Sequence, residues 1–181
     1  MPRPRGYDPI VLGERMRDVF WVRGYDGTSL SDLVSATGVR SGSLHAGFGQ
    51  KPDLFAAALA AYDGVFEGAM DVQGRGRARL RAYIDLLYDR VTSDPHRRGC
   101  FVIASASELD RHTEANRTAI RDRIDRMSAF VNAAFGEDGI DDADGAAAFL
   151  GAVVALLTLA RCGATTDTLR GIRDEAKRRL G

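Results

Sequence analysis

The stretch SLSDLVSATGVRSGSLHAGF (residues 29–48) carries the strongest local signal for the fold. Ser29 and Asp32 have the capping-box spacing, which predicts the start of a short helix. Gly38 can take the positive φ that a tight turn needs before a second short helix. Two short helices around a turn, within about twenty residues, have the spacing of a helix-turn-helix. A plain helical hairpin has the same spacing, so this pattern leaves both interpretations open.

The second short helix has side chains suited to nucleic acid. Val39 and Phe48 can anchor it to the neighbouring helices. Guanidinium, hydroxyl and imidazole groups can then contact phosphates and base edges. The residues that we expect to project are Arg40, Ser41, Ser43, His45 and Ala46.

Outside this stretch the apolar residues also recur at helical spacing, and no run alternates as a β-strand does. We therefore predict an all-α chain of about nine helices. Residues 1–51 would form a three-helix DNA-binding domain, and residues 52–181 a larger helical ligand-binding and dimerisation domain. The expected helices after residue 51 include one through residues 52–66, one ending before Asp94 and Pro95, and the segments 114–135, 146–160 and 167–180, with a compact apolar segment at 99–109.

Composition excludes several classes of protein. Hydrophobic residues make up 45% of the 181 positions and the 25 basic residues balance 25 acidic ones, which excludes a disordered chain. The longest apolar run, residues 146–160, is shorter than the roughly 20 residues that a bilayer requires, so no membrane association is expected. Two distant cysteines, Cys100 and Cys162, favour a reducing, cytoplasmic setting over a disulfide scaffold.

No catalytic or metal-binding motif stands out. The histidines form no metalloprotease pattern, and the residues between His96 and Cys100 argue against a shared helix face for a metal pair. We expect neither an enzyme nor a bound cofactor or metal. Cys100 follows two arginines, which would suit a redox-sensing thiolate, although a buried, inert thiol is the simpler interpretation.

The chain closely resembles the DNA-binding domain of the TetR family of bacterial transcriptional repressors. The matching stretches are VFWVRGYDGTSLSDLVSATGV (residues 19–39) and SGSLHAGFGQKPDLFAAAL (residues 41–59). Two positions depart from the family pattern. His45 stands where tyrosine is usual, and Gly47 stands where a bulky aromatic or histidine is usual. These departures predict a DNA affinity weaker than usual for the family or an unusual operator, because Gly47 removes a contact and loosens the helix end.

The resemblance implies a homodimeric repressor that binds a palindromic operator in double-stranded DNA and is released by a small, largely apolar effector. The alternative is a helical small-molecule-binding protein with weak or lost DNA binding. Candidate DNA contacts implied by the resemblance are Thr28, Ser29, Arg40, Ser41, Ser43, His45, Ala46 and Lys51, with Arg3 and Arg5 in a basic arm that suits the minor groove.

The same resemblance implies two further sites in the larger domain. The effector would bind among the side chains of Phe55, Leu59, Tyr62, Phe66, Tyr83, Leu87, Phe101, Met127 and Phe130. The dimer interface would be a four-helix bundle made by two helices of each subunit, through Phe149, Val153, Leu156, Leu157, Ala160, Leu169 and Ile172.

Overall fold

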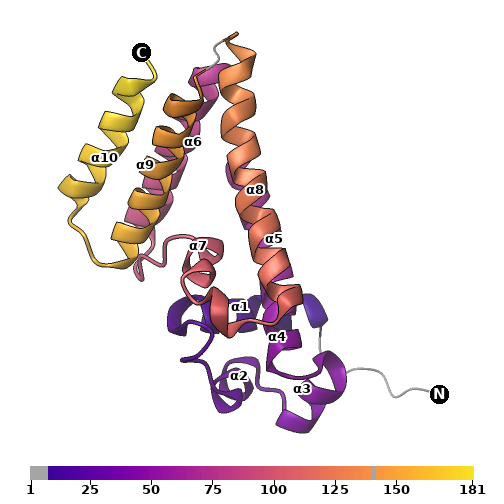
Figure 1. Cartoon of the computed structure of the whole chain (residues 1–181). Helices are drawn as coiled ribbons and strands as arrows, with labels where there is room; N and C mark the ends of the chain where they lie inside the picture. The colour runs from indigo at the N-terminus through magenta and orange to yellow at the C-terminus, as the bar shows by residue number, and fades with distance from the viewer. Residues whose placement is uncertain (1–7, 140–141) are drawn as a thin grey trace.

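The computed structural model describes residues 8–139 and 142–181, and every regular element in these ranges is helical (Figure 1). This confirms the predicted all-α class. The elements are α1 (Pro9–Arg23), α2 (Leu30–Thr37), α3 (Ser41–Phe48), α4 (Lys51–Ala60), α5 (Asp63–Met70), α6 (Gly76–Ser93), α7 (Phe101–Ala106), the 3₁₀ turn η1 (Leu109–Arg111), α8 (Glu114–Glu137), α9 (Ala143–Arg161) and α10 (Thr166–Arg179).

Local sequence sets where the first helices begin and end. The Asp8 carboxylate accepts a hydrogen bond from the amide of Ile10 and caps α1, whose first residue is a proline. The capping box between Ser29 and Asp32 forms as predicted at the start of α2. Gly38 ends α2 with φ of 72°, in the left-handed region that favours glycine.

The expected helix through residues 52–66 is two helices in the structure. α4 stops at Ala60 and α5 starts at Asp63. The guanidinium of Arg17 donates to the carbonyl of Ala61 at 3.2 Å, so a side chain of α1 binds a backbone group at the break. The break does not change which residues are inside, because Phe55, Leu59, Tyr62 and Phe66 are all buried.

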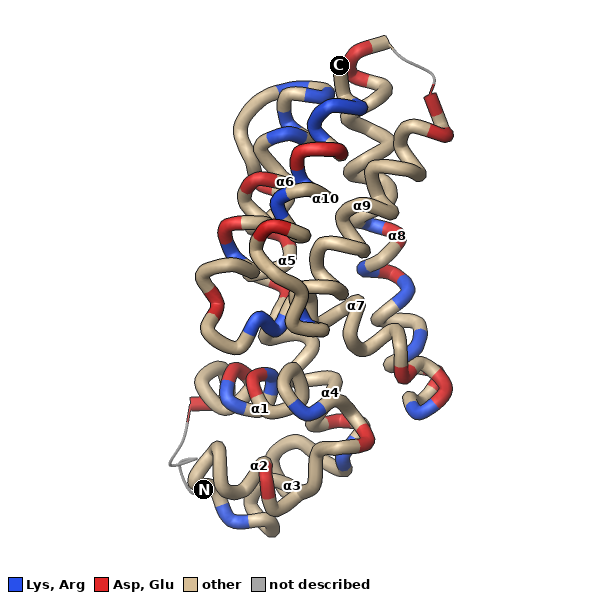
Figure 2. Tube along the Cα trace, turned by 90° about the vertical axis from the view of Figure 1, so that its left-hand side faces the viewer, with Lys and Arg blue, Asp and Glu red and all other residues tan. Residues whose placement is uncertain are grey.

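The molecule is elongated, with α2 and α3 at one end and the C-terminus at the other (Figures 1 and 2). α1 and α4 pack closely together above α2 and α3, and the long helices α6, α8, α9 and α10 form the larger body. The predicted domain boundary, between residues 51 and 52, falls in the first turn of α4.

α9 carries no charged residue between Asp144 and Arg161 (Figure 2). Its 19 residues are long and apolar enough to cross a membrane by length and composition alone, and it is longer than the segment predicted from the sequence. It packs against α6, α8 and α10, as a core helix of a folded domain does.

Candidate DNA interface and effector cavity

The α2–turn–α3 unit is held together by two buried leucines and by side-chain hydrogen bonds to backbone carbonyls. Leu33 and Leu44 are fully buried, one on each helix. The hydroxyl of Thr37 donates to the carbonyl of Leu33, and the guanidinium of Arg15 on α1 donates to the carbonyl of Thr37 at 3.1 Å. The unit is thereby fixed to α1 while the outer side of α3 stays exposed.

Four of the side chains predicted to project from the second helix do so. Arg40, Ser41, Ser43 and Ala46 are exposed, and within the described ranges none of the four has a side-chain hydrogen bond or ion pair. Ser29 is exposed as well, but its hydroxyl takes part in the cap of α2. This end of the molecule therefore presents a surface of hydroxyl, guanidinium and methyl groups.

His45 and Lys51 are less free than the sequence suggested. The Nδ1 atom of the half-buried His45 lies 2.8 Å from the carbonyl oxygen of Gly49. Because a carbonyl can only accept, Nδ1 carries the proton, and in the neutral ring Nε2 is then an acceptor that cannot donate to a phosphate. The ammonium of Lys51 lies 4.6 Å from the centre of the Tyr25 ring. At the same helix start, the Asp53 carboxylate already accepts the amide of Gln50.

Thr28 requires a correction. Its side chain is 1% exposed and its hydroxyl donates to the carbonyl of Gly24 at 2.6 Å. A buried hydroxyl with an internal partner cannot reach a phosphate, so Thr28 leaves the set of candidate contacts. Arg3 and Arg5 lie outside the described residues.

A junction that the sequence did not reveal joins the α2–α3 end of the molecule to the body formed by the long helices. Both carboxylate oxygens of Glu108 accept backbone amides of the loop after α1, from Tyr25 at 2.8 Å and Asp26 at 3.1 Å. The buried ring of His112 lies 4.3 Å from the ring centres of both Tyr25 and Phe55. Glu108 lies more than eighty residues from Tyr25 and Asp26 in the chain, and no local pattern signals such a pairing.

A cavity of about 400 Å³ is lined by Arg17 and Trp21 of α1 and by residues of α5, α6 and α8. Of the nine residues predicted to line a pocket, five do so: Tyr62, Phe66, Tyr83, Leu87 and Met127. Phe55, Leu59 and Phe101 are a correction, because they are buried in the core and do not line the cavity. Phe130 also lies outside the lining, where its ring packs edge-on against Tyr83 at 5.0 Å.

The cavity lining also contains residues that the helical stripes did not single out. Trp21 comes from α1, and its indole nitrogen donates to the carbonyl of Arg98. Arg17, Arg90 and Arg98 bring three cations to the lining. The sequence could not assign these arginines to a cavity, because only the packing of the folded chain shows where each side chain points.

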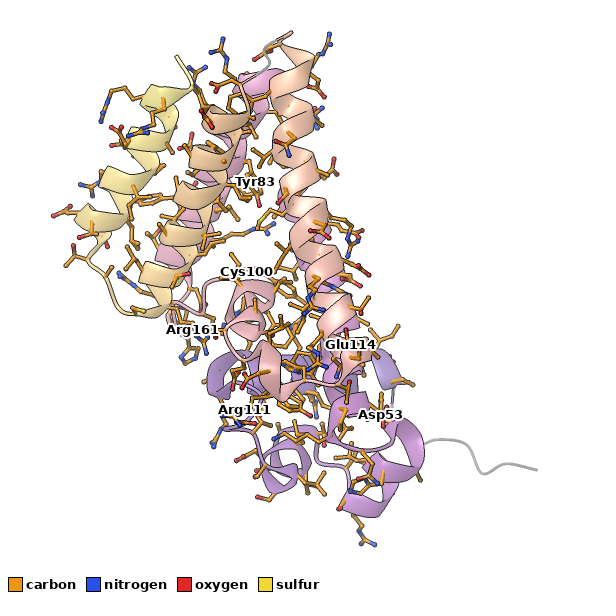
Figure 3. All side chains as sticks on the ribbon, viewed as in Figure 1. Asp53, Tyr83, Cys100, Arg111, Glu114 and Arg161 are labelled. Atoms are coloured by element: carbon orange, nitrogen blue, oxygen red, sulfur yellow. The ribbon has the colours of Figure 1, made fainter. Side chains whose placement is uncertain are left out.

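Cys100 lines the cavity as a buried thiol between the body helices (Figure 3). Its sulfur lies 3.7 Å from the Tyr62 hydroxyl. Burial raises the pKa of the Cys100 thiol, and the same desolvation raises the pKa of Tyr62 well above its ordinary value. The neighbouring Arg98 binds Asp94 and Asp18 instead of the thiol. These contacts favour the inert thiol over the redox-sensing thiolate.

The predicted dimer interface also requires a correction. Its members on α9 and α10 are buried inside the single chain, apart from the half-buried Ile172: Phe149, Val153, Leu156, Leu157, Ala160 and Leu169. A side chain that its own chain already covers has little surface left for a partner, although Phe149 still lines the groove between α9 and α10. The opposite face of α9 is exposed, with Ala147, Gly151, Val154 and Thr158.

Comparison with known proteins gives matches over both parts of the chain. Residues 16–58 match the family model described as bacterial regulatory proteins of the tetR family, and residues 76–171 match that of the tetracyclin repressor-like C-terminal domain. The chain is 32% identical over 112 residues to the HTH-type transcriptional repressor ComR of Escherichia coli, covering 59% of this chain and 53% of ComR. It is 34% identical over 116 residues to the uncharacterized regulator YezE of Bacillus subtilis, covering 62% and 60%. The chain thus matches little more than half the length of these two relatives.

Solved structures agree over nearly the whole chain. The TetR-family regulator CifR, in a cysteine mutant complexed with 26-bp double-strand operator DNA, superposes with a TM-score of 0.77 at 28% identity, covering 97% of this chain and 98% of CifR. NemR of E. coli in its reduced form has the same fold at 19% identity, with a TM-score of 0.77 and coverage of 95% and 96%. With the C-terminal family model matching more than half of its residues, this chain belongs to the tetR family of bacterial regulatory proteins.

Proposed function

We propose that this protein is a cytoplasmic, homodimeric transcriptional repressor that binds a palindromic operator and is released by a small effector. The observation that carries the proposal is the exposed surface formed by Arg40, the cap of α3, and by Ser41, Ser43 and Ala46 on α3. Among the described residues these side chains have no hydrogen bond or ion pair, and they lie at one end of a tetR-family chain. A second helix presented in this way fits the major groove. The operator-bound CifR structure supports the same assignment.

A dimer follows from the recognition geometry, because one helix-turn-helix covers one half-site. We place the two-fold interface on the exposed face of α9 together with α10. This face combines small residues with Val154, which is 37% exposed, and Ile172 lines the groove between the two helices. Small side chains let two helices approach closely, and an exposed apolar face favours a partner.

The effector would act by population shift. A molecule that binds the cavity more tightly in the conformer with the wrong half-site spacing lowers the DNA affinity by that difference in affinity. The cavity is lined by Arg17 and Trp21 of α1, and α1 packs against α2 and α4. A ligand that shifts α1 would therefore also shift the position of α3.

The test of DNA binding is the selection of bound duplexes from a randomised pool, at two salt concentrations. We expect enrichment of a palindrome and a steep loss of affinity with salt. Lys51→Ala should weaken binding to all duplexes alike, whereas Arg40→Ala should change the base preference at one position of each half-site. Folded protein that enriches no sequence at either salt would overturn the proposal.

That outcome would instead support the alternative, a helical small-molecule-binding protein with weak or lost DNA binding. Two features at the C-terminal end of α3 favour it. The imidazole of His45 is hydrogen-bonded to the carbonyl of Gly49, and Gly47 has no side chain that could contact DNA.

The interface is tested by sedimentation of Val154→Asp. A carboxylate on a buried interface is strongly unfavourable, so this variant should sediment as a monomer. Ala129→Asp, which makes a similar change at an exposed site on α8, serves as the control and should remain dimeric. A dimeric Val154→Asp protein would show that this face of α9 is not the interface.

A further inference from the structure

The cavity has an apolar body and a charged edge. Trp21, Phe66, Leu87 and Met127 supply rings and aliphatic surface. The lining also holds three arginines against a single aspartate, Asp94. A volume of about 400 Å³ lies within the range of pockets that take small organic molecules. The walls alone would accept a neutral apolar compound, so the charged edge is what selects among ligands.

Two of the three arginines have acidic partners within the protein. Arg98 pairs with Asp94 at 3.1 Å and Asp18 at 3.3 Å, and it also lies 4.5 Å from the Trp21 ring centre. Arg17 pairs with Asp18 at 3.0 Å. Both guanidinium groups therefore have their charge largely balanced before any ligand arrives.

Arg90 differs from these two. Its guanidinium donates to the carbonyl of Val65 at 3.1 Å, and it forms no ion pair with any residue in the ranges 8–139 and 142–181. A carbonyl balances no charge, so the Arg90 residue, of intermediate exposure, leaves an unbalanced cation beside an apolar space. Such a cation attracts an anion more strongly than one in open water does.

Tyr83 adds a directed hydrogen-bond donor. It is 2% exposed and lies among the body helices (Figure 3), with its ring packed against Phe130. Its hydroxyl has no hydrogen-bond partner among the described residues, although it lines the cavity. Burial raises the pKa of Tyr83 above its ordinary value, so the hydroxyl stays protonated and able to donate.

Tyr83, Leu87 and Arg90 follow one face of α6 at helical spacing, so the donor and the cation both face the same cavity. We propose that the effector is an apolar carboxylate whose body lies between Trp21, Phe66 and Met127 and whose carboxylate pairs with Arg90 and accepts a hydrogen bond from Tyr83. This inference rests on the proposed function, since it names the class of effector for the same cavity.

The test is calorimetric titration of the full chain, without DNA, using matched pairs of compounds. The probes are 4-phenylbutyrate with 4-phenylbutyramide, and biphenyl-4-carboxylate with its amide. The members of each pair share the apolar body and differ in charge. We expect at least one carboxylate to bind at least tenfold more tightly than its amide.

Variants then assign the preference to its residues. Arg90→Gln should bring the carboxylate to the affinity of its amide and leave the amide unchanged, whereas Arg90→Lys should keep most of the preference. Tyr83→Phe should weaken carboxylate binding several-fold. Arg121→Gln, which removes an exposed arginine on α8, is the matched control and should keep the full preference.

The inference is overturned if neither carboxylate is preferred to its amide, or if Arg90→Gln keeps the preference. Because the titration contains no DNA, its result is independent of the duplex selection. Loss of DNA binding with an intact carboxylate preference would overturn the repressor function alone. An enriched palindrome without a carboxylate preference would overturn only the effector class.

Discussion

Phe20 and Trp21 are consecutive residues of α1, yet they belong to two aromatic clusters of opposite character. The junction cluster, Phe20 with Tyr25, Phe55 and His112, is buried with ring centres as close as 4.3 Å, and none of its rings lines the cavity. The cavity cluster, Trp21 with Tyr62, Phe66 and Tyr83, borders open space on one side. α1 therefore packs tightly against the junction cluster through Phe20 and borders the cavity through Trp21.

The two clusters differ in what they can do: the junction is tightly packed, whereas the cavity leaves room for a ligand. Close packing at the junction, where Glu108 binds the loop after α1, couples the α2–α3 end to this part of the body. Trp21 and Tyr62 border the cavity, so an occupant would contact both rings. A ligand that displaces Trp21 would then move α1, and the junction would carry that movement to α2 and α3.

The largest expected effect comes from removing one ring from each cluster. Phe55→Ala should lower the free energy of unfolding by about 3–5 kcal/mol, because it empties a fully packed site. Phe66→Ala should cost only about 2 kcal/mol, because the ring already borders open space and its loss creates less new cavity. Urea denaturation of both variants measures the two costs. Equal losses would contradict the distinction between a closed and an open cluster.

The second effect concerns the polar link of the junction. Glu108→Ala leaves the amides of Tyr25 and Asp26 without their carboxylate partner and should cost about 1–3 kcal/mol. Asp110→Ala, at a neighbouring exposed carboxylate, is the control and should change stability by less than about 0.5 kcal/mol. Hydrogen exchange should show faster opening of the loop after α1 in the Glu108 variant only. Unchanged exchange would mean that Glu108 does not hold the two parts together.

The smallest effect at neutral pH concerns His112, both of whose ring nitrogens lack a hydrogen-bond partner in the described part of the chain. His112→Phe should be neutral or slightly stabilising at pH 7, within about 1 kcal/mol, because an apolar ring suits the site between Tyr25 and Phe55.

The pH dependence of the same variant has a definite sign. Desolvation lowers the pKa of His112; the carboxylates of Glu108, Asp26 and Asp110 act in the opposite direction, and the Lys51 ammonium adds to the lowering. The unfolded chain therefore takes up the proton first, and stability falls as the pH drops below the ordinary imidazole value of about 6.5. His112→Phe should lose less stability than the wild type between about pH 7 and pH 5. Parallel loss in the two proteins would show that His112 is not an acid-sensitive point of the junction.

The sequence by itself determined the local elements. Asp8, the Ser29–Asp32 pair and Gly38 fix helix ends through contacts within a few residues, so the class and the α2–turn–α3 unit could be predicted. The exposed residues of α3 followed from the same local periodicity. Family motifs in residues 19–59 pointed to the same unit.

Only the tertiary structure decided which side of each element is covered. α9 is apolar on nearly every side, so its periodicity could not separate the face that packs on α6 and α8 from the free face with Val154. The aromatic stripe of α4 and α5 gave no sign that Phe55 joins the closed junction while Phe66 borders the cavity. Burial, unlike a helix cap, depends on chain segments far away in the sequence, and Glu108 meets its partners at Tyr25 and Asp26 only because the whole chain has folded.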